Sequence, residues 1–169
     1  MDIPNEQFAN SYLLFCFIRG LNSEIESDIR KELKNTKLTF PSFRILWILY
    51  FHSDINMSQL TYLTQTNISN VFRQLEKLNK HDYVVIKNGA DHRIKNISLS
   101  EQGKQIVTDF MRRNTKDTEL QIVQLIESIP KEDLAKFIEV CSILSNKLLG
   151  EPFSTFVMKS TNDLLNTST

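Results

Sequence analysis

The segment from Asn67 to His81 constrains the fold of this chain more than any other stretch. Its large aliphatic residues recur at steps of three, four and three positions: Ile68, Val71, Leu75 and Leu78. At 3.6 residues per turn this spacing places all four on one face, which predicts an amphipathic helix that packs inward. The Asn67 side chain can cap the first turn. The opposite face is polar and basic: Ser69, Asn70, Arg73, Lys77 and Lys80.

The flanking sequence predicts a helix-turn-helix followed by a small β-wing. A shorter helix begins at Ser58, and a turn at residues 64–66 leads into the second helix. Residues 83–87 are β-branched or aromatic, Asn88-Gly89 is a strong turn signal, and residues 97–99 form the return strand. In this context the basic face is suited to a major groove. Taken alone, the helix would favour the alternative of an ordinary solvated face.

The predicted wing resembles that of the MarR-type winged-helix transcriptional regulators. Their wing typically reads Asp-x-Arg-x-x-x-hydrophobic-x-Leu-Thr-Glu-x-Gly, and residues 91–103 read Asp-His-Arg-Ile-Lys-Asn-Ile-Ser-Leu-Ser-Glu-Gln-Gly. The resemblance extends from about Phe8 to Leu149. Residues 45–48 (Ile-Leu-Trp-Ile) and 150–153 (Gly-Glu-Pro-Phe) are most similar to the Hpr (ScoC) type of bacilli, whose members repress protease and sporulation genes.

Three positions depart from the pattern of that family. The turn between the two helices often contains Gly, where this chain has Gln65. The recognition helix usually ends at Gly, where this chain has Asp82, a residue type that tolerates a left-handed conformation. The first basic residue of the wing is often Arg, and His92 replaces it here, which would weaken the wing contacts.

The resemblance implies a single domain over residues 1–169, mainly α with a small β-wing. Within it, the winged helix-turn-helix occupies residues 41–103 and a helical dimerisation region occupies residues 5–36 and 104–165. The long first helix is apolar on more than one side of its first half, and a partner subunit is the simplest cover. Binding to a membrane surface is the weaker alternative, because Arg19 is the only basic residue before Arg30.

Further helices are expected on both sides of the helix-turn-helix. Pro41 suits the first turn of a second helix. A long helix is expected from Glu101 to Glu127, with a polar middle that crosses solvent. Another runs from Pro130 to Gly150, and a short apolar tail adds one or two turns.

The expected partners are double-stranded DNA and a second copy of the chain. The predicted DNA contacts of the recognition helix are Asn67, Ser69, Asn70, Arg73, Gln74 and Lys77. Those of the wing are Asp91, His92, Arg93 and Lys95, with Arg93 at the minor groove by resemblance to the family's wing Arg. A possible pocket for an unknown small-molecule effector comprises Tyr12, Phe43, Trp47 and Tyr50, for which plain core packing is the favoured alternative.

The distribution of charge along the chain agrees with DNA binding, although the net charge of zero gives no sign of it. The chain has 20 Lys and Arg against 20 Asp and Glu. Between residues 56 and 104 there are seven Lys and Arg against four Asp and Glu, which gives this part a net charge of +3.

Other function classes find little support. The best catalytic candidates are the histidines His52, His81 and His92, and neither His81 nor His92 has a partner at nucleophile–base spacing. No Gly-rich phosphate loop or metal-ligand spacing occurs, so no enzyme, cofactor or metal is expected. An acidic N-terminus and a longest apolar run of seven residues, 12–18, predict a cytoplasmic protein without a membrane span. Two alternative functions are kept: a winged helix that binds only protein, and a derepressor of the same fold that responds to a small molecule or to redox conditions.

The redox alternative concerns Cys16. The resemblance implies that some relatives sense organic peroxides through one Cys near the start of the first helix. Counted back from Thr39-Phe40-Pro41, that position falls on Phe15 rather than on Cys16. One residue rotates a helix by about 100°, so the thiol would face other neighbours. We therefore predict that Cys16 is an inert, buried apolar residue.

Overall fold

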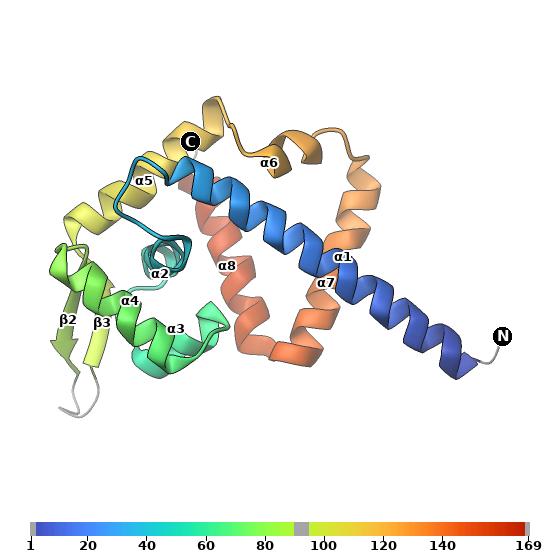
Figure 1. The fold of residues 1–169 in the computed structure, drawn as a ribbon, viewed down its shortest axis with the longest axis horizontal. Coiled ribbons are helices and arrows are strands. Elements are labelled where there is room, and N and C mark those ends of the chain that lie inside the picture. Colours follow the sequence, from blue (N-terminus) through green and yellow to red (C-terminus); the bar gives the residue numbers. More distant parts are fainter. Residues whose placement is uncertain (1–2, 90–94, 168–169) are drawn as a thin grey trace.

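The computed structural model describes residues 3–89 and 95–167 and confirms a mainly helical fold with a small sheet (Figure 1). The helices are α1 Ile3–Glu32, α2 Phe40–Phe51, α3 Met57–Thr64, α4 Ile68–Lys80, α5 Glu101–Lys116, α6 Gln121–Ile126, α7 Lys131–Leu149 and α8 Glu151–Thr167. The strands are β1 Ile55–Asn56, β2 Val84–Asn88 and β3 Lys95–Leu99. Helices α2 to α5 and the sheet share the main core, whose fully buried side chains include Leu46, Leu60, Val71 and Val107.

Local capping fixes the ends of the two helices of the helix-turn-helix. Helix α3 begins with a capping box, in which the Asn56 side chain accepts from the Gln59 amide and the Gln59 side chain accepts from the Asn56 amide. The Asn67 side chain accepts from the Asn70 amide at 2.8 Å, which confirms the predicted cap of α4. Gln65 and Asp82 have φ angles of 50° and 55°, so both adopt the left-handed conformation at the positions where relatives often have Gly.

The wing is part of a three-stranded antiparallel sheet with the strand order β1-β3-β2. Strands β2 and β3 pair from Val84↔Leu99 to Asn88↔Lys95, so Asn88 belongs to the strand rather than to the turn. Strand β1 was not predicted, because two residues are too short for an alternating pattern. It attaches the start of α3 to β3 and closes one edge of the wing.

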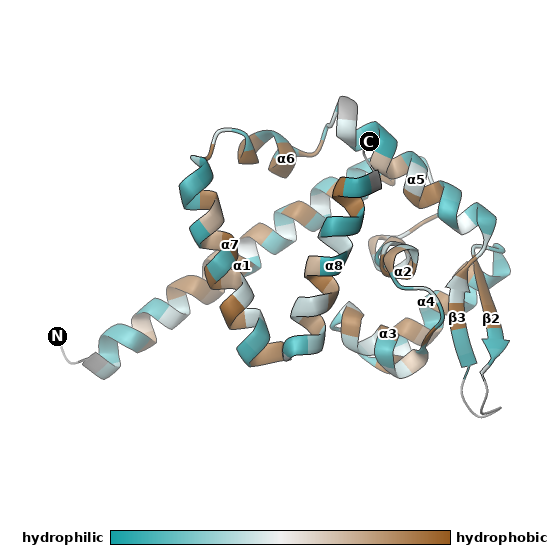
Figure 2. Cartoon of the chain, turned by 180° about the vertical axis from the view of Figure 1, so that it is seen from behind, coloured by the Kyte–Doolittle hydropathy of each residue, from teal (hydrophilic) through white to brown (hydrophobic). Residues whose placement is uncertain are grey.

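The N-terminal half of helix α1 extends away from the rest of the chain (Figures 1 and 2). Apolar side chains are exposed along this half. The largest of them are Phe8, Tyr12, Phe15 and Phe17, which are 61–76% exposed. Cys16 is exposed as well, so its predicted burial is wrong for the single chain. Among residues 3–89 and 95–167, no helix combines the length and the apolarity that a membrane span requires.

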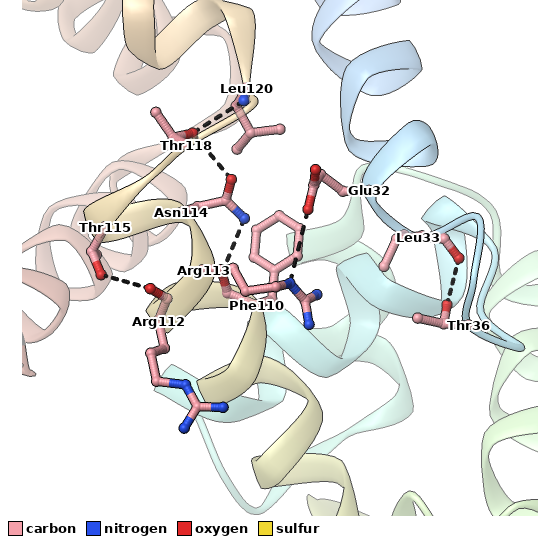
Figure 3. Close-up of polar contacts among 10 residues, drawn as sticks. All are labelled: Glu32, Leu33, Thr36, Phe110, Arg112, Arg113, Asn114, Thr115, Thr118 and Leu120. Carbon is pink, nitrogen blue, oxygen red and sulfur yellow. Dashed lines mark hydrogen bonds and ion pairs between the residues drawn. The ribbon is translucent and has the colours of Figure 1, made fainter.

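The predicted single helix over residues 101–127 is wrong, because the chain turns after α5 (Figure 3). The Thr118 hydroxyl donates to Asn114 Oδ1 and accepts from the Leu120 amide, both at 3.1 Å. Leu120 is thereby buried with Phe110 and Leu33, and the Gln121 amide donates to the Asp28 carboxylate of α1. The polar stretch therefore folds back onto the end of α1 instead of crossing solvent.

The C-terminal tail is also longer than predicted, since α8 contains 17 residues. Gly150, with a φ of 98°, ends α7 as expected and connects it to α8, which packs against α7. The Tyr62 hydroxyl of α3 donates to the Leu149 carbonyl at 2.7 Å, and the His52 ring lies 4.7 Å from the ring of Phe156. These contacts join the two C-terminal helices to the winged helix-turn-helix.

Candidate nucleic-acid interface

Helix α4 separates a buried face from an exposed polar face much as the sequence predicts. Val71, Leu75 and Leu78 are at most 2% exposed and pack into the core. The exposed residues among the predicted contacts are Asn67, Ser69, Arg73 and Lys77, while Asn70 is half-buried. Ile68 is 55% exposed, so its predicted inward position is wrong: it is the first residue of the helix and lies beyond the edge of the core.

Gln74 does not belong to the exposed face, contrary to the prediction. Its side chain is 7% exposed, and its Oε1 atom accepts a hydrogen bond from the Ser42 hydroxyl at 2.7 Å. Its Nε2 atom donates to Asn70 Oδ1 at 3.3 Å. The Gln74 amide therefore faces α2 and is already hydrogen-bonded within the protein, which leaves it no exposed edge for a base.

The predicted set omitted two neighbouring exposed residues in the middle of α4, Phe72 and Glu76. Phe72 is 54% exposed, and Glu76 is exposed beside it. Phe72 lies outside the buried stripe and, with Ile86, lines a cavity of about 430 Å³ between α4 and the base of the wing. An apolar side chain at this edge can contact thymine methyl groups. Its place between Val71 and Arg73, off the aliphatic stripe, was the signal that could have identified it.

The wing is described only at its base. Lys95 is exposed at the start of β3, opposite Asn88. Asp91, His92 and Arg93 lie outside the described residues, so their assignment as DNA contacts stays a prediction. Lys87 is a further exposed cation on β2, which adds positive charge on the strand paired with β3.

The four aromatic residues of the predicted effector pocket do not enclose a cavity within one chain. Phe43 is 3% exposed, and its ring lies 4.5 Å from that of Phe110 in the core. Trp47 packs on the same ring at 6.0 Å. Tyr50 packs on Phe51, and Tyr12 is 63% exposed on the first half of α1. Core packing is the correct interpretation of Phe43, because Leu33, Phe110 and Leu120 fill the space around it.

Comparison with known proteins decides the family. Residues 38–94 match the model of the MarR family, which covers the helix-turn-helix and the first strand of the wing. The HTH-type transcriptional regulator SarZ of Staphylococcus aureus is 34% identical over 111 residues, which are 63% of this chain and 75% of SarZ. The chain belongs to the MarR family. Members of this family are DNA-binding transcription regulators rather than enzymes.

Solved structures of MarR proteins share the fold at low sequence identity. A MarR protein from Peptoclostridium difficile aligns with a TM-score of 0.71 and 17% identity over 84% of this chain and 91% of its own. FabT of Streptococcus pneumoniae, solved in complex with DNA, aligns with a TM-score of 0.59 and 18% identity over 85% of this chain and 96% of its own. At these identities the likeness concerns the fold alone.

Proposed function

We propose that this MarR-family protein is a sequence-specific repressor of transcription that binds a pseudo-palindromic operator as a homodimer. The observation that carries the proposal is the outer face of α4, where Ser69, Arg73 and Lys77 are exposed above a buried aliphatic stripe. Short polar and basic side chains on a recognition helix can reach base edges and phosphates in a major groove. A winged helix that binds only protein would be expected to present an apolar face there.

The proposed dimer interface consists of α1 and the C-terminal helices, within residues 5–36 and 104–165. Helix α1 exposes a row of aromatic side chains, and α7 exposes Phe137, Ile138, Val140 and Ile143 at 51–53% each. Apolar surface of this extent is costly in water and is typical of an interface. A two-fold dimer would present two copies of α4 to successive major grooves, about 34 Å apart.

The proposed DNA surface comprises the exposed face of α4 and the wing. Asn67, Ser69, Asn70, Arg73 and Lys77 would contact the major groove and its phosphates. Lys95, together with Asp91, His92 and Arg93, would lie at the adjoining backbone and minor groove. This division assigns base reading to the helix and mainly electrostatic anchoring to the wing.

The decisive experiment is selection of bound sequences from a random pool of DNA duplexes, followed by titrations at several salt concentrations. We expect a two-fold symmetric consensus and a dimer at micromolar protein concentration. Affinity should fall about 10³-fold between roughly 50 and 200 mM salt, because Lys and Arg side chains release counterions from several phosphates. A monomer in solution, or binding that is indifferent to salt, would contradict the proposal.

Two narrower assignments complete the proposal. We assign the chain to the Hpr (ScoC) type on residues 45–48 and 150–153, and we place it in the cytoplasm with the genes that it would control. The alternative of a redox-responsive derepressor is separated by titrating the operator with and without organic peroxide. Release of DNA from the parent protein, abolished in Cys16→Ser, would favour that alternative over an inert Cys16.

A further inference from the structure

A chain of hydrogen bonds connects the outer face of α4 to the first turn of α2. Gln74 is at its centre: it follows Arg73 in the sequence, yet its side chain is only 7% exposed. Its Oε1 atom accepts from the Ser42 hydroxyl at 2.7 Å and from the Thr39 hydroxyl at 3.3 Å. Thr39 is the N-cap of α2, and Ser42 is buried in the first turn of that helix. Gln74 therefore ties α4 to the start of α2.

The other end of the Gln74 amide leads to the exposed surface through Asn70. Gln74 Nε2 donates to Asn70 Oδ1 at 3.3 Å, and the same oxygen accepts from Arg73 Nη2 at 3.1 Å. Asn70 Nδ2 donates to the Thr66 hydroxyl at 3.2 Å, in the turn between α3 and α4. Because both ends of the Asn70 amide are engaged, its oxygen is held toward the guanidinium of Arg73.

This arrangement matters for the chemistry that Arg73 can perform. A guanidinium has five N–H donors in a rigid fork, and the bond to Asn70 occupies one of its terminal nitrogens. Within the part of the chain that the structure describes, the remaining donors of Arg73 have no hydrogen-bond partner, and the residue is exposed. A side chain that is already held in one orientation loses less conformational freedom when it contacts a base, and it discriminates better between bases.

We propose that Gln74 is a positioning residue for DNA recognition, which acts through Asn70 to hold Arg73 in the orientation that reads bases. The inference rests on the proposed DNA-binding function and extends it to a residue that touches no DNA itself. It also accounts for an amide at a buried position of α4. An apolar side chain would pack there without any polar group to satisfy, whereas a buried amide requires hydrogen-bond partners.

The test uses Gln74→Met, which keeps the length of the side chain and removes both amide groups. The variant and the parent protein are titrated with a duplex that carries the selected operator and with a scrambled duplex, at one salt concentration. Discrimination is the Kd for the scrambled duplex divided by the Kd for the operator. This ratio should fall about three- to tenfold, which is a part of the loss expected when Arg73 itself is removed. The Kd for the scrambled duplex should not change, because phosphate contacts are intact. If Gln74 had a purely structural role, Gln74→Met would bind both duplexes more weakly by the same factor, and that result would overturn the inference.

A double-mutant cycle tests whether the effect passes through Arg73. In the Arg73→Ala background, Gln74→Met should cause no further loss of discrimination, because no guanidinium remains to be oriented. The same loss in both backgrounds would overturn the inference. Leu78→Ala is the matched control, since Leu78 is buried in α4 away from the hydrogen-bonded chain. It should lower the melting temperature and leave the ratio of Kd values unchanged.

If Gln74→Met does not fold, Ser42→Ala provides the same test, because Ser42 lies at the other end of the series of hydrogen bonds. It removes the hydroxyl that donates to Gln74 at 2.7 Å and leaves α4 itself unaltered. We expect Ser42→Ala to lose discrimination to the same extent as Gln74→Met. In the Arg73→Ala background, Ser42→Ala should cause no further loss. A parent protein that prefers no sequence would refute the proposed function. A parent that discriminates, with unchanged discrimination in Gln74→Met and Ser42→Ala, would refute only the role of Gln74.

Discussion

Arg73 is the residue on which sequence reading is expected to depend most. It is exposed in the middle of α4, and among the described residues its guanidinium donates a hydrogen bond to Asn70. Arg73→Ala should weaken operator binding by about 1–3 kcal/mol and relax the preference at the contacted base pair, if the guanidinium makes a bidentate base contact. Titrations against the operator and its single-base variants measure both effects.

Lys77→Ala is the control for this prediction, because Lys77 lies one turn further along the same face. A lysine that contacts only phosphate should weaken binding evenly across sequences and reduce the salt slope by about one. Both variants should remain folded, since neither side chain is buried. If Arg73→Ala and Lys77→Ala lose affinity in the same even way, α4 does not read bases through Arg73.

The difference between Gln74 and its neighbours illustrates what residue patterns could and could not predict. The aliphatic stripe and the Asn67 cap depend on residues within one helix, and both were predicted correctly apart from Ile68. Gln is a residue type that is usually exposed, and hydrogen bonds to Ser42 and Thr39, 32 and 35 positions earlier, hold the Gln74 side chain inward. A pairing of this kind between two helices leaves no periodic signal in the sequence.

At the scale of elements, the junction between the sheet and α5 depends on the absence of a side chain at Gly103. A Cβ atom there would lie 2.1 Å from the Tyr83 carbonyl oxygen and 3.2 Å from Leu99 Cδ2. That carbonyl also accepts a hydrogen bond from the backbone amide of Ser100, the N-cap residue of α5, so moving it would break this bond. We expect Gly103→Ala to destabilise the fold by about 1–3 kcal/mol, as overpacking does.

Urea unfolding measures this loss, with Gln102→Ala as the control. Gln102 is the exposed neighbour of Gly103 in the first turn of α5, and its truncation should change the free energy of unfolding by less than about 0.5 kcal/mol. Equal stabilities for Gly103→Ala and the parent would mean that the strand and the helix separate more easily than their packing implies.

The elements that were mispredicted share a physical cause. The helix expected through residues 101–127 ends at Lys116 because Leu120 finds a buried site against Leu33 and Phe110. Helix α8 was expected as one or two turns around Phe153, Phe156 and Val157, but it contains 17 residues. It is stabilised by packing against α7 and α2. In both cases tertiary contacts outweigh the local pattern.

At the scale of the whole molecule, His52 is where the winged helix-turn-helix meets the C-terminal helices. It caps the end of α2, and its ring packs on Phe156 of α8. Its Nε2 atom is buried without a hydrogen-bond partner in the described part of the chain. Burial, and to a lesser extent the charge of Lys159, lowers the pKa of His52 below its ordinary value of 6.5, while Asp163 opposes this.

The lowered pKa makes the contact between α2 and α8 sensitive to acid. In the folded protein the imidazole resists protonation, whereas in the unfolded chain it takes up a proton as the pH falls through 6.5. Its contribution to stability is therefore complete above pH 6.5 and declines as the pH falls below that value, toward the lower pKa of the folded state. We expect the melting temperature of the parent protein to drop more between pH 7.5 and pH 5.5 than that of His52→Gln, which cannot titrate.

His81→Gln is the matched control for this experiment, because His81 is exposed at the end of α4 and stacks on Tyr83 rather than on a C-terminal helix. Between pH 7.5 and pH 5.5, the melting temperature of His81→Gln should fall by as much as that of the parent protein. Thermal unfolding of the three proteins at both pH values decides the matter. If His52→Gln loses as much melting temperature as the parent, the acid sensitivity arises elsewhere. The contact of α8 with α2 would then hold the C-terminal helices against the winged helix-turn-helix equally well at both pH values.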